Sequence, residues 1–139
     1  MDKRVLVDTS VLISFYNKGL FDEQLRGLNQ SCELFFSAVT INEFIRGAHN
    51  KDSKDIVQSF MEIVSDQIVT PTEAQWIECG SVSEQILKGK KRSKEGVLLL
   101  QNDILIGLNA RDAKAQLVTS DHADFKILKD FIKMSVDFW

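Results

Sequence analysis

The sequence has little of what marks a secreted, membrane-spanning or multidomain protein. Only two of its 139 residues are cysteines, too few for a disulfide framework, so we expect two free thiols in a reducing cytosol. No apolar run approaches the ~20 residues of a membrane span, and the run after the N-terminus is too short for a signal peptide. A single proline and the lack of any Pro/Gly/Ser linker predict one domain over residues 1–139. The expected free thiols predict a location in the cytoplasm.

Positive charge is also scarce. Lys and Arg number 17 against 20 Asp and Glu, so the formal net charge is −3. This balance excludes a protein that binds nucleic acid through its overall charge alone. The cations are unevenly spread, however, because residues 88–94 read Lys-Gly-Lys-Lys-Arg-Ser-Lys. This basic segment either binds phosphate or is a solvated loop that ends the preceding helix favourably.

What is present is an alternation of short apolar runs with segments of helical periodicity. The runs predict strands at 4–7, 33–36, 67–69, 116–119 and 133–136. The periodic segments predict helices at 9–18, 21–30, from 40 onward, at 51–61, at 72–88 and at 93–112. Strands that alternate with helices indicate an α/β fold with a parallel sheet covered on both faces. In such sheets ligands bind beyond the carboxyl ends of the strands.

Three aspartates follow predicted strands. Asp8 comes directly after the strand 4–7, Asp121 stands two residues after the strand 116–119, and Asp124 follows three residues later. A helix N-cap would explain Asp8, and an Asx turn would explain either of the other two. The alternative is a ligand site at the carboxyl edge of the sheet.

Two further carboxylates lie on predicted helices. Glu43 follows Thr40 at the spacing of a capping box, in which each side chain bonds the other's backbone. Asp103 is flanked at helical spacing by Leu99 and Ile104, which places its charge within an apolar face. Because burying an unpaired carboxylate is costly, Asp103 has to be paired, protonated or bound to a cation.

Acids from strand ends and from helices packed over those ends can converge on one point. Carboxylates held that close repel one another unless a cation neutralises them. Hard oxygen ligands without Cys-x-x-Cys or His-x-x-x-His spacing predict Mg²⁺ or Mn²⁺ rather than Zn²⁺. We expect the two histidines, His49 and His122, at the surface rather than in catalysis.

Four short segments stand in order along essentially the whole chain. They are Val-Leu-Val-Asp-Thr-Ser at 5–10, Thr-Ile-Asn-Glu-Phe-Ile-Arg-Gly at 40–47, Asn-Asp at 102–103 and Thr-Ser-Asp-His-Ala-Asp-Phe at 119–125. Through them the sequence resembles the PIN-domain ribonuclease family, and more narrowly the VapC-type toxins of bacterial toxin–antitoxin pairs. The resemblance implies a single PIN domain with a three-layer α/β/α fold around a five-stranded parallel sheet.

The resemblance also implies roles for individual residues. The acidic metal site that it implies consists of Asp8, Glu43, Asp103 and Asp121, with Asp124 as a further acidic residue. Hydroxyl groups beside the site would orient carboxylates or water; they belong to Thr9, Ser10 and Thr119. The implied activity is Mg²⁺- or Mn²⁺-dependent endoribonuclease cleavage that leaves 5′-phosphate and 3′-hydroxyl ends. The implied partners are a second copy of the chain and a small antitoxin that covers the site.

Substrate RNA has to be held by cations, because the acids repel phosphate. Candidate phosphate contacts are Arg46, one turn beyond Glu43, and Lys90, Lys91 and Arg92 of the basic segment. Two alternatives share the fold: a housekeeping RNA-processing PIN nuclease, and a non-catalytic PIN-like module that binds RNA or protein. A receiver domain would need paired acids after the first strand, and a haloacid-dehalogenase phosphatase would need Asp-x-Asp there; both patterns are missing.

Overall fold

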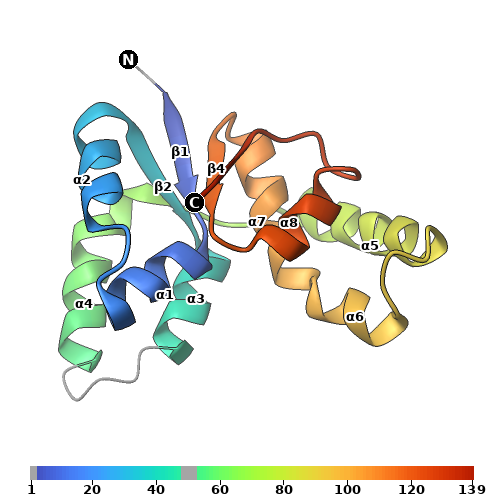
Figure 1. The fold of residues 1–139 in the computed structure, drawn as a ribbon, viewed down its shortest axis with the longest axis horizontal. Coiled ribbons are helices and arrows are strands. Elements are labelled where there is room, and N and C mark those ends of the chain that lie inside the picture. Colours follow the sequence, from blue (N-terminus) through green and yellow to red (C-terminus); the bar gives the residue numbers. More distant parts are fainter. Residues whose placement is uncertain (1–2, 48–52) are drawn as a thin grey trace.

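A computed structural model of the chain describes residues 3–47 and 53–139. Its centre is a five-stranded sheet with all strands parallel and the strand order β3-β2-β1-β4-β5 (Figure 1). The strands are β1 (Arg4–Val7), β2 (Glu33–Ser37), β3 (Ile68–Val69), β4 (Gln116–Thr119) and β5 (Val136–Phe138). This sheet confirms the α/β prediction and the five parallel strands implied by the resemblance.

The central strands are buried on both faces, and their side chains alternate between two cores. Val5 and Val7 of β1 pack into one core, and Leu6 packs into the other. Neighbouring strands repeat the pattern, with Val118 in the first core and Leu117 in the second. Because successive side chains of a strand point to opposite faces, short continuous apolar runs suffice to build both cores.

Helices cover both faces of the sheet. The helices of the N-terminal half are α1 (Thr9–Lys18), α2 (Asp22–Ser31), α3 (Ala38–Gly47) and α4 (Ser53–Val64), which is followed by the 3-10 turn η1 (Ser65–Gln67). The remaining helices are α5 (Glu73–Lys88), α6 (Lys94–Leu99), α7 (Gln101–Asp112) and α8 (His122–Leu128). Figure 1 shows α1, α2 and α4 on one side of the strands and α5, α6 and α8 on the other. In the described part of the chain, no helix has the length and apolar character needed to cross a membrane.

Several predicted elements differ from the observed ones. The predicted helix 93–112 is wrong as one unit, because it breaks at Leu100, whose side chain is buried while that of Leu99 is 82% exposed. The third helix begins at Ala38 rather than at residue 40, and the last strand begins at Val136 rather than at 133. The short helix α8 was not predicted. The first two residues of the predicted helix 51–61 lie outside the described residues.

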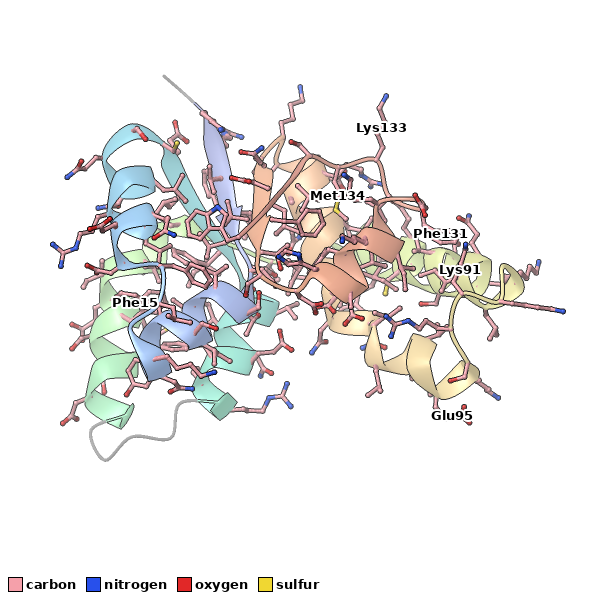
Figure 2. The ribbon with its side chains drawn as sticks, in the orientation of Figure 1. Phe15, Lys91, Glu95, Phe131, Lys133 and Met134 are labelled. Carbon is pink, nitrogen blue, oxygen red and sulfur yellow. The ribbon has the colours of Figure 1, made fainter. Side chains whose placement is uncertain are left out.

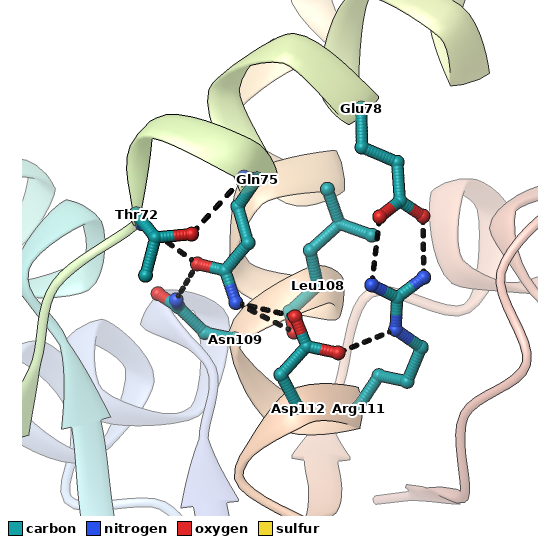
Figure 3. Close-up of polar contacts among 7 residues, drawn as sticks. All are labelled: Thr72, Gln75, Glu78, Leu108, Asn109, Arg111 and Asp112. Atoms are coloured by element: carbon teal, nitrogen blue, oxygen red, sulfur yellow. Dashed lines mark hydrogen bonds and ion pairs between the residues drawn. The ribbon is translucent and has the colours of Figure 1, made fainter.

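A polar network with buried Gln75 and Asn109 at its centre fixes α7 against α5 (Figure 3) and, through Asn109, against β2. Gln75 of α5 accepts a hydrogen bond from the Asn109 amide at 2.8 Å and donates to the Asp112 carboxylate at 2.8 Å. Asn109 in turn accepts from the Ser37 hydroxyl at 2.7 Å, at the end of β2. Gln75 also closes a capping box with Thr72 at the start of α5. Since α7 carries Asp103, this network sets the position of that carboxylate.

Candidate metal centre

Asp8 lies at the carboxyl edge of the sheet and is only 2% exposed. Its backbone N–H donates to the Val118 carbonyl at 2.9 Å, which anchors the residue between β1 and β4. Asp8 stands at the N-cap position of α1, but its side chain makes no capping hydrogen bond. Instead, Oδ2 accepts from the hydroxyls of Ser10 and Thr119, each at 2.8 Å. The N-cap alternative therefore does not account for this side chain.

The second oxygen of Asp8, Oδ1, is buried and has no hydrogen-bond partner among the described residues. A buried acceptor without a donor is costly, and a buried anionic one more so. Burial accordingly raises the pKa of Asp8, although the hydroxyls of Thr119 and Ser10 oppose the shift. A bound cation would satisfy this oxygen.

Asp103 lies in the first turn of α7, where the positive end of the helix favours a carboxylate. Its surroundings are nevertheless unfavourable to charge. Burial raises the pKa of Asp103 to about 9, assisted by the negative charges of Asp8 and Asp121 and by a hydrogen bond with Asp124. The predicted apolar surroundings are correct only in part, because Leu99 points away into solvent beyond the break at Leu100.

Asp121 and Asp124 complete a cluster with Asp103. One carboxylate oxygen from each of the three lies within 4.8 Å of the others. Asp121 also caps α8, because its Oδ1 accepts from the backbone N–H of Asp124 at 3.1 Å. Burial raises the pKa of Asp121, and the neighbouring Asp124 carboxylate adds to the shift. The Asp121 side chain therefore both caps α8 and belongs to the acidic cluster.

Arg92 supplies an ion pair to this cluster. Its Nη2 lies 2.7 Å from Oδ1 of Asp124, and the two side chains are 30% and 26% exposed. The pair connects the basic segment 88–94 directly to the acidic cluster. The sequence predicts Arg92 only as a phosphate contact, because its carboxylate partner stands 32 residues away in the chain.

Glu43 is held by hydrogen bonds to both of its carboxylate oxygens. The Thr9 hydroxyl donates to Oε1 at 2.7 Å, and the Asn102 amide donates to Oε2 at 3.3 Å. These two donors are the chain neighbours of Asp8 and Asp103. The contact of Asn102 was not predicted, although Asn102 directly precedes Asp103 in the sequence.

The capping-box alternative for Glu43 is wrong. Because α3 begins at Ala38, Thr40 lies inside the helix rather than at its start. The Thr40 hydroxyl is buried without a hydrogen-bond partner among the described residues, so it does not cap the helix. Ser37 does so instead, since its hydroxyl accepts from the Val39 backbone N–H at 3.1 Å.

The remaining predicted residues lie at the surface. Arg46 is exposed in the last turn of α3, and Lys90 and Lys91 are exposed in the loop between α5 and α6, where Figure 2 labels Lys91. His122 is exposed, with Nε2 2.8 Å from the Trp139 carbonyl oxygen. His49 lies outside the described residues.

The donor set fits a hard divalent cation. The acidic centre consists of the Asp103, Asp121 and Asp124 cluster together with Asp8, which is not one of those three oxygens but whose charge acts on Asp103. Glu43 is connected to it through hydrogen bonds to Thr9 and Asn102, the chain neighbours of Asp8 and Asp103. In the described part of the chain, these carboxylates receive one ion pair, that of Arg92. Their mutual repulsion and the unsatisfied oxygen of Asp8 are both relieved by a cation, and all-carboxylate ligands favour Mg²⁺ or Mn²⁺.

A model of the PIN domain matches residues 5–130 of the sequence. The chain belongs to the PIN-domain family. Ribonuclease VapC1 of Methanocaldococcus jannaschii is a distant relative, 28% identical over 130 residues that cover 94% of this chain and 85% of that protein.

Solved structures agree with the PIN fold. VapBC-1 from nontypeable Haemophilus influenzae superposes with a TM-score of 0.69 at 22% identity and covers 98% of both chains. VapBC2 from Rickettsia felis, solved bound to a promoter DNA fragment, gives a TM-score of 0.69 at 20% identity with the same coverage. The predicted family is therefore confirmed, together with a distant relationship to VapC ribonuclease toxins.

Proposed function

We propose that this PIN protein is a metal-dependent endoribonuclease that hydrolyses phosphodiester bonds in RNA. The main supporting observation is the acidic centre, in which three aspartate oxygens lie within 4.8 Å of one another beside a buried Asp8 oxygen that has no donor. A protein that only bound RNA would gain nothing from this arrangement, because concentrated negative charge repels phosphate. A non-catalytic module is therefore the weaker alternative.

We propose that Asp8, Asp103 and Asp121 hold Mg²⁺ or Mn²⁺, with Glu43 and Asp124 completing the acidic surroundings. When bound, a divalent ion lowers the pKa of water and stabilises negative charge on phosphate oxygens. Around it, Ser10 and Thr119 fix the orientation of the Asp8 carboxylate through their hydroxyl hydrogen bonds.

Glu43 is suited to accept a proton from the attacking water. Its pair of hydrogen bonds to Thr9 and Asn102 holds the carboxylate in one orientation beside the cluster. Hydrolysis of this kind leaves 5′-phosphate and 3′-hydroxyl ends. Metal-free cleavage through the ribose 2′-hydroxyl usually uses positioned histidines, and the described histidine, His122, is exposed and contacts the carbonyl of Trp139.

We further propose that the protein is the cytoplasmic toxin of a toxin–antitoxin pair and acts as a homodimer. The support is its relationship to ribonuclease VapC1 and its likeness to chains solved as VapBC complexes. An apolar groove of about 380 Å³ between α1, α2 and α4, lined in part by Leu12, Phe15 and Phe60, offers a protein partner an apolar surface. A housekeeping PIN nuclease would share the chemistry but would lack an antitoxin gene beside its own.

An RNA cleavage assay with Mg²⁺ or Mn²⁺ tests the proposed activity. We expect Asp8→Asn and Asp103→Asn each to slow cleavage by about 100-fold or more, because each removes a carboxylate from the acidic centre. Asp130→Asn removes an equal charge from an exposed turn and serves as the matched control. Cleavage by both variants at the wild-type rate would contradict the proposed site.

A further inference from the structure

A second charged site lies at the amino ends of the central strands, at the edge of the sheet opposite to the acidic centre. It is a pocket of about 420 Å³ in which five of the lining side chains are cationic and none is acidic: Lys3, Arg4, Arg111, Lys114 and Lys133. In a chain with a net charge of −3, five cations around one pocket are a marked concentration. A pocket of this volume has room for a group of nucleotide size.

Three of these cations are available to a ligand. Arg111 is held by ion pairs to Glu78 and Asp112, and Arg4 lies 3.6 Å from the Glu33 carboxylate. Lys3, Lys114 and Lys133 have no such ion pair within 3–47 and 53–139, so their ammonium groups are free to bind an anion. The two arginines, by contrast, are neutralised by these carboxylates, so the positive charge of the pocket comes from the three lysines.

Lys114 occupies a backbone position that normally favours glycine. Its φ is +55°, in the left-handed region, where it closes the end of α7 while the Ala115 backbone N–H donates to the Ala110 carbonyl at 2.9 Å. Glycine is the residue that usually ends a helix in this way, because a Cβ is disfavoured there. A lysine at this position carries its charge to the pocket at a cost in backbone strain.

The pocket is separate from the acidic centre. It lies at the amino ends of β1 and β4, near Arg4 and Gln116, whereas Asp8 follows the carboxyl end of β1. Four residues of extended strand span about 13 Å. In Figure 1 β1 runs downward from the end nearest the N-terminus, and in Figure 2 Lys133 projects from the upper edge of the molecule.

We propose that this pocket binds the phosphates of a polynucleotide strand outside the bond that is cut. Lysine ammonium groups recognise phosphate as point charges, and the pocket has no aromatic lining residue on which a base could stack. Binding should therefore be independent of base sequence and strongly dependent on salt. The identity of the strand as RNA rests on the proposed function; the assignment of the pocket to strand phosphates does not.

The test is a salt titration of binding to a single-stranded RNA of about 20 nucleotides in EDTA, so that no metal-dependent cleavage intervenes. The pocket variant is Lys114→Gly with Lys133→Gln, and the control Lys18→Gln with Arg26→Gln removes two exposed charges from α1 and α2. We expect the pocket variant to bind roughly tenfold more weakly near 0.1 M salt. Its plot of log K against log salt should be shallower by about 1.4, at about 0.7 per lost phosphate contact.

The control should bind as the wild type does. Lys114→Gly also relieves backbone strain, so a melting temperature at or above that of the wild type separates loss of binding from loss of folding.

Equal salt slopes for the wild type and the pocket variant would overturn the proposal. Retained RNA binding by a variant that has lost affinity for a free nucleoside monophosphate would also overturn it, in favour of a small-anion site. Competition by polyglutamate as effective as that by RNA would overturn the assignment to phosphate.

This test does not depend on catalysis. If the wild type fails to cut RNA with Mg²⁺ but the pocket variant loses binding, the proposed function fails and the pocket assignment stands. If cleavage occurs and the salt slopes are equal, the reverse holds.

Discussion

Asp103 is the residue whose ionisation most directly tests the energetics of the acidic centre. Burial and three neighbouring aspartates all act against its ionisation and raise its pKa to about 9. An unfolded aspartate has a pKa of about 3.9. Because the folded state then holds the proton more tightly than the unfolded state, ionisation of Asp103 costs stability as pH rises between these two values. A bound divalent cation would remove that cost.

We expect the free energy of unfolding of metal-free protein to fall, through this group, as pH rises from about 4 to 9. Asp103→Asn abolishes the titration, so the metal-free variant should be more stable than the wild type at pH 8 by about 1–2 kcal/mol. Mg²⁺ should stabilise the wild type at pH 8 and the variant much less. Urea unfolding of the wild type and the variant at pH 5 and pH 8, with EDTA or with Mg²⁺, measures the pH dependence of stability, the difference between the two proteins and the effect of Mg²⁺ on each. A difference between wild type and variant that is the same at both pH values would contradict this account.

At the scale of elements, the position of Asp103 depends on how α7 is held. The helix joins α5 through Gln75, a residue that is 5% exposed and whose side-chain amide bonds both Asn109 and Asp112. Buried polar groups joined in this way are favourable only while every member keeps its partner. The network therefore couples the stability of the fold to the geometry of the acidic centre.

Gln75→Ala should destabilise the protein by about 2–3 kcal/mol, because it leaves the Asn109 amide without an acceptor and opens the capping box with Thr72. Gln85→Ala, on an exposed position of the same helix, should change the stability by less than about 0.5 kcal/mol. Denaturant unfolding of the two variants checks the difference. Equal effects would show that the network contributes nothing beyond helix propensity.

Elements whose limits are set by local chemistry could be predicted from the sequence. The strand 4–7 and the helix 9–18 match the observed β1 and α1, since the strand is a short apolar run and Gly19 ends the helix at a φ of +68°. The break at Leu100 could not, because the apolar spacing continues through it and only tertiary packing places Leu100 inside and Leu99 outside.

The site follows the same rule. The acids at strand ends could be identified from the sequence, because parallel strands bring their carboxyl ends to one edge. The contacts of Arg92 and Asn102 could not be predicted, since each residue pairs with one more than thirty positions away in the chain. The periodicity of the sequence carries no information about such distant contacts.

At the scale of the whole molecule, charge is segregated along the strand direction. Acids gather beyond the carboxyl ends of β1 and β4, and five cations gather around the pocket at their amino ends. The parallel sheet makes this segregation possible, because the carboxyl ends of all its strands lie at one edge and their amino ends lie at the other. A net charge of −3 therefore conceals two local fields of opposite sign, and the positive one comes from Lys3, Lys114 and Lys133.

The most direct measurement is a crystal structure with Mn²⁺, read through the anomalous signal of the ion. The account predicts a peak bound by Asp103 and Asp121, within reach of the Oδ1 oxygen of Asp8, and its loss in Asp103→Asn. Crystals saturated with Mn²⁺ that show no peak at these carboxylates, or a peak elsewhere on the molecule, would contradict it.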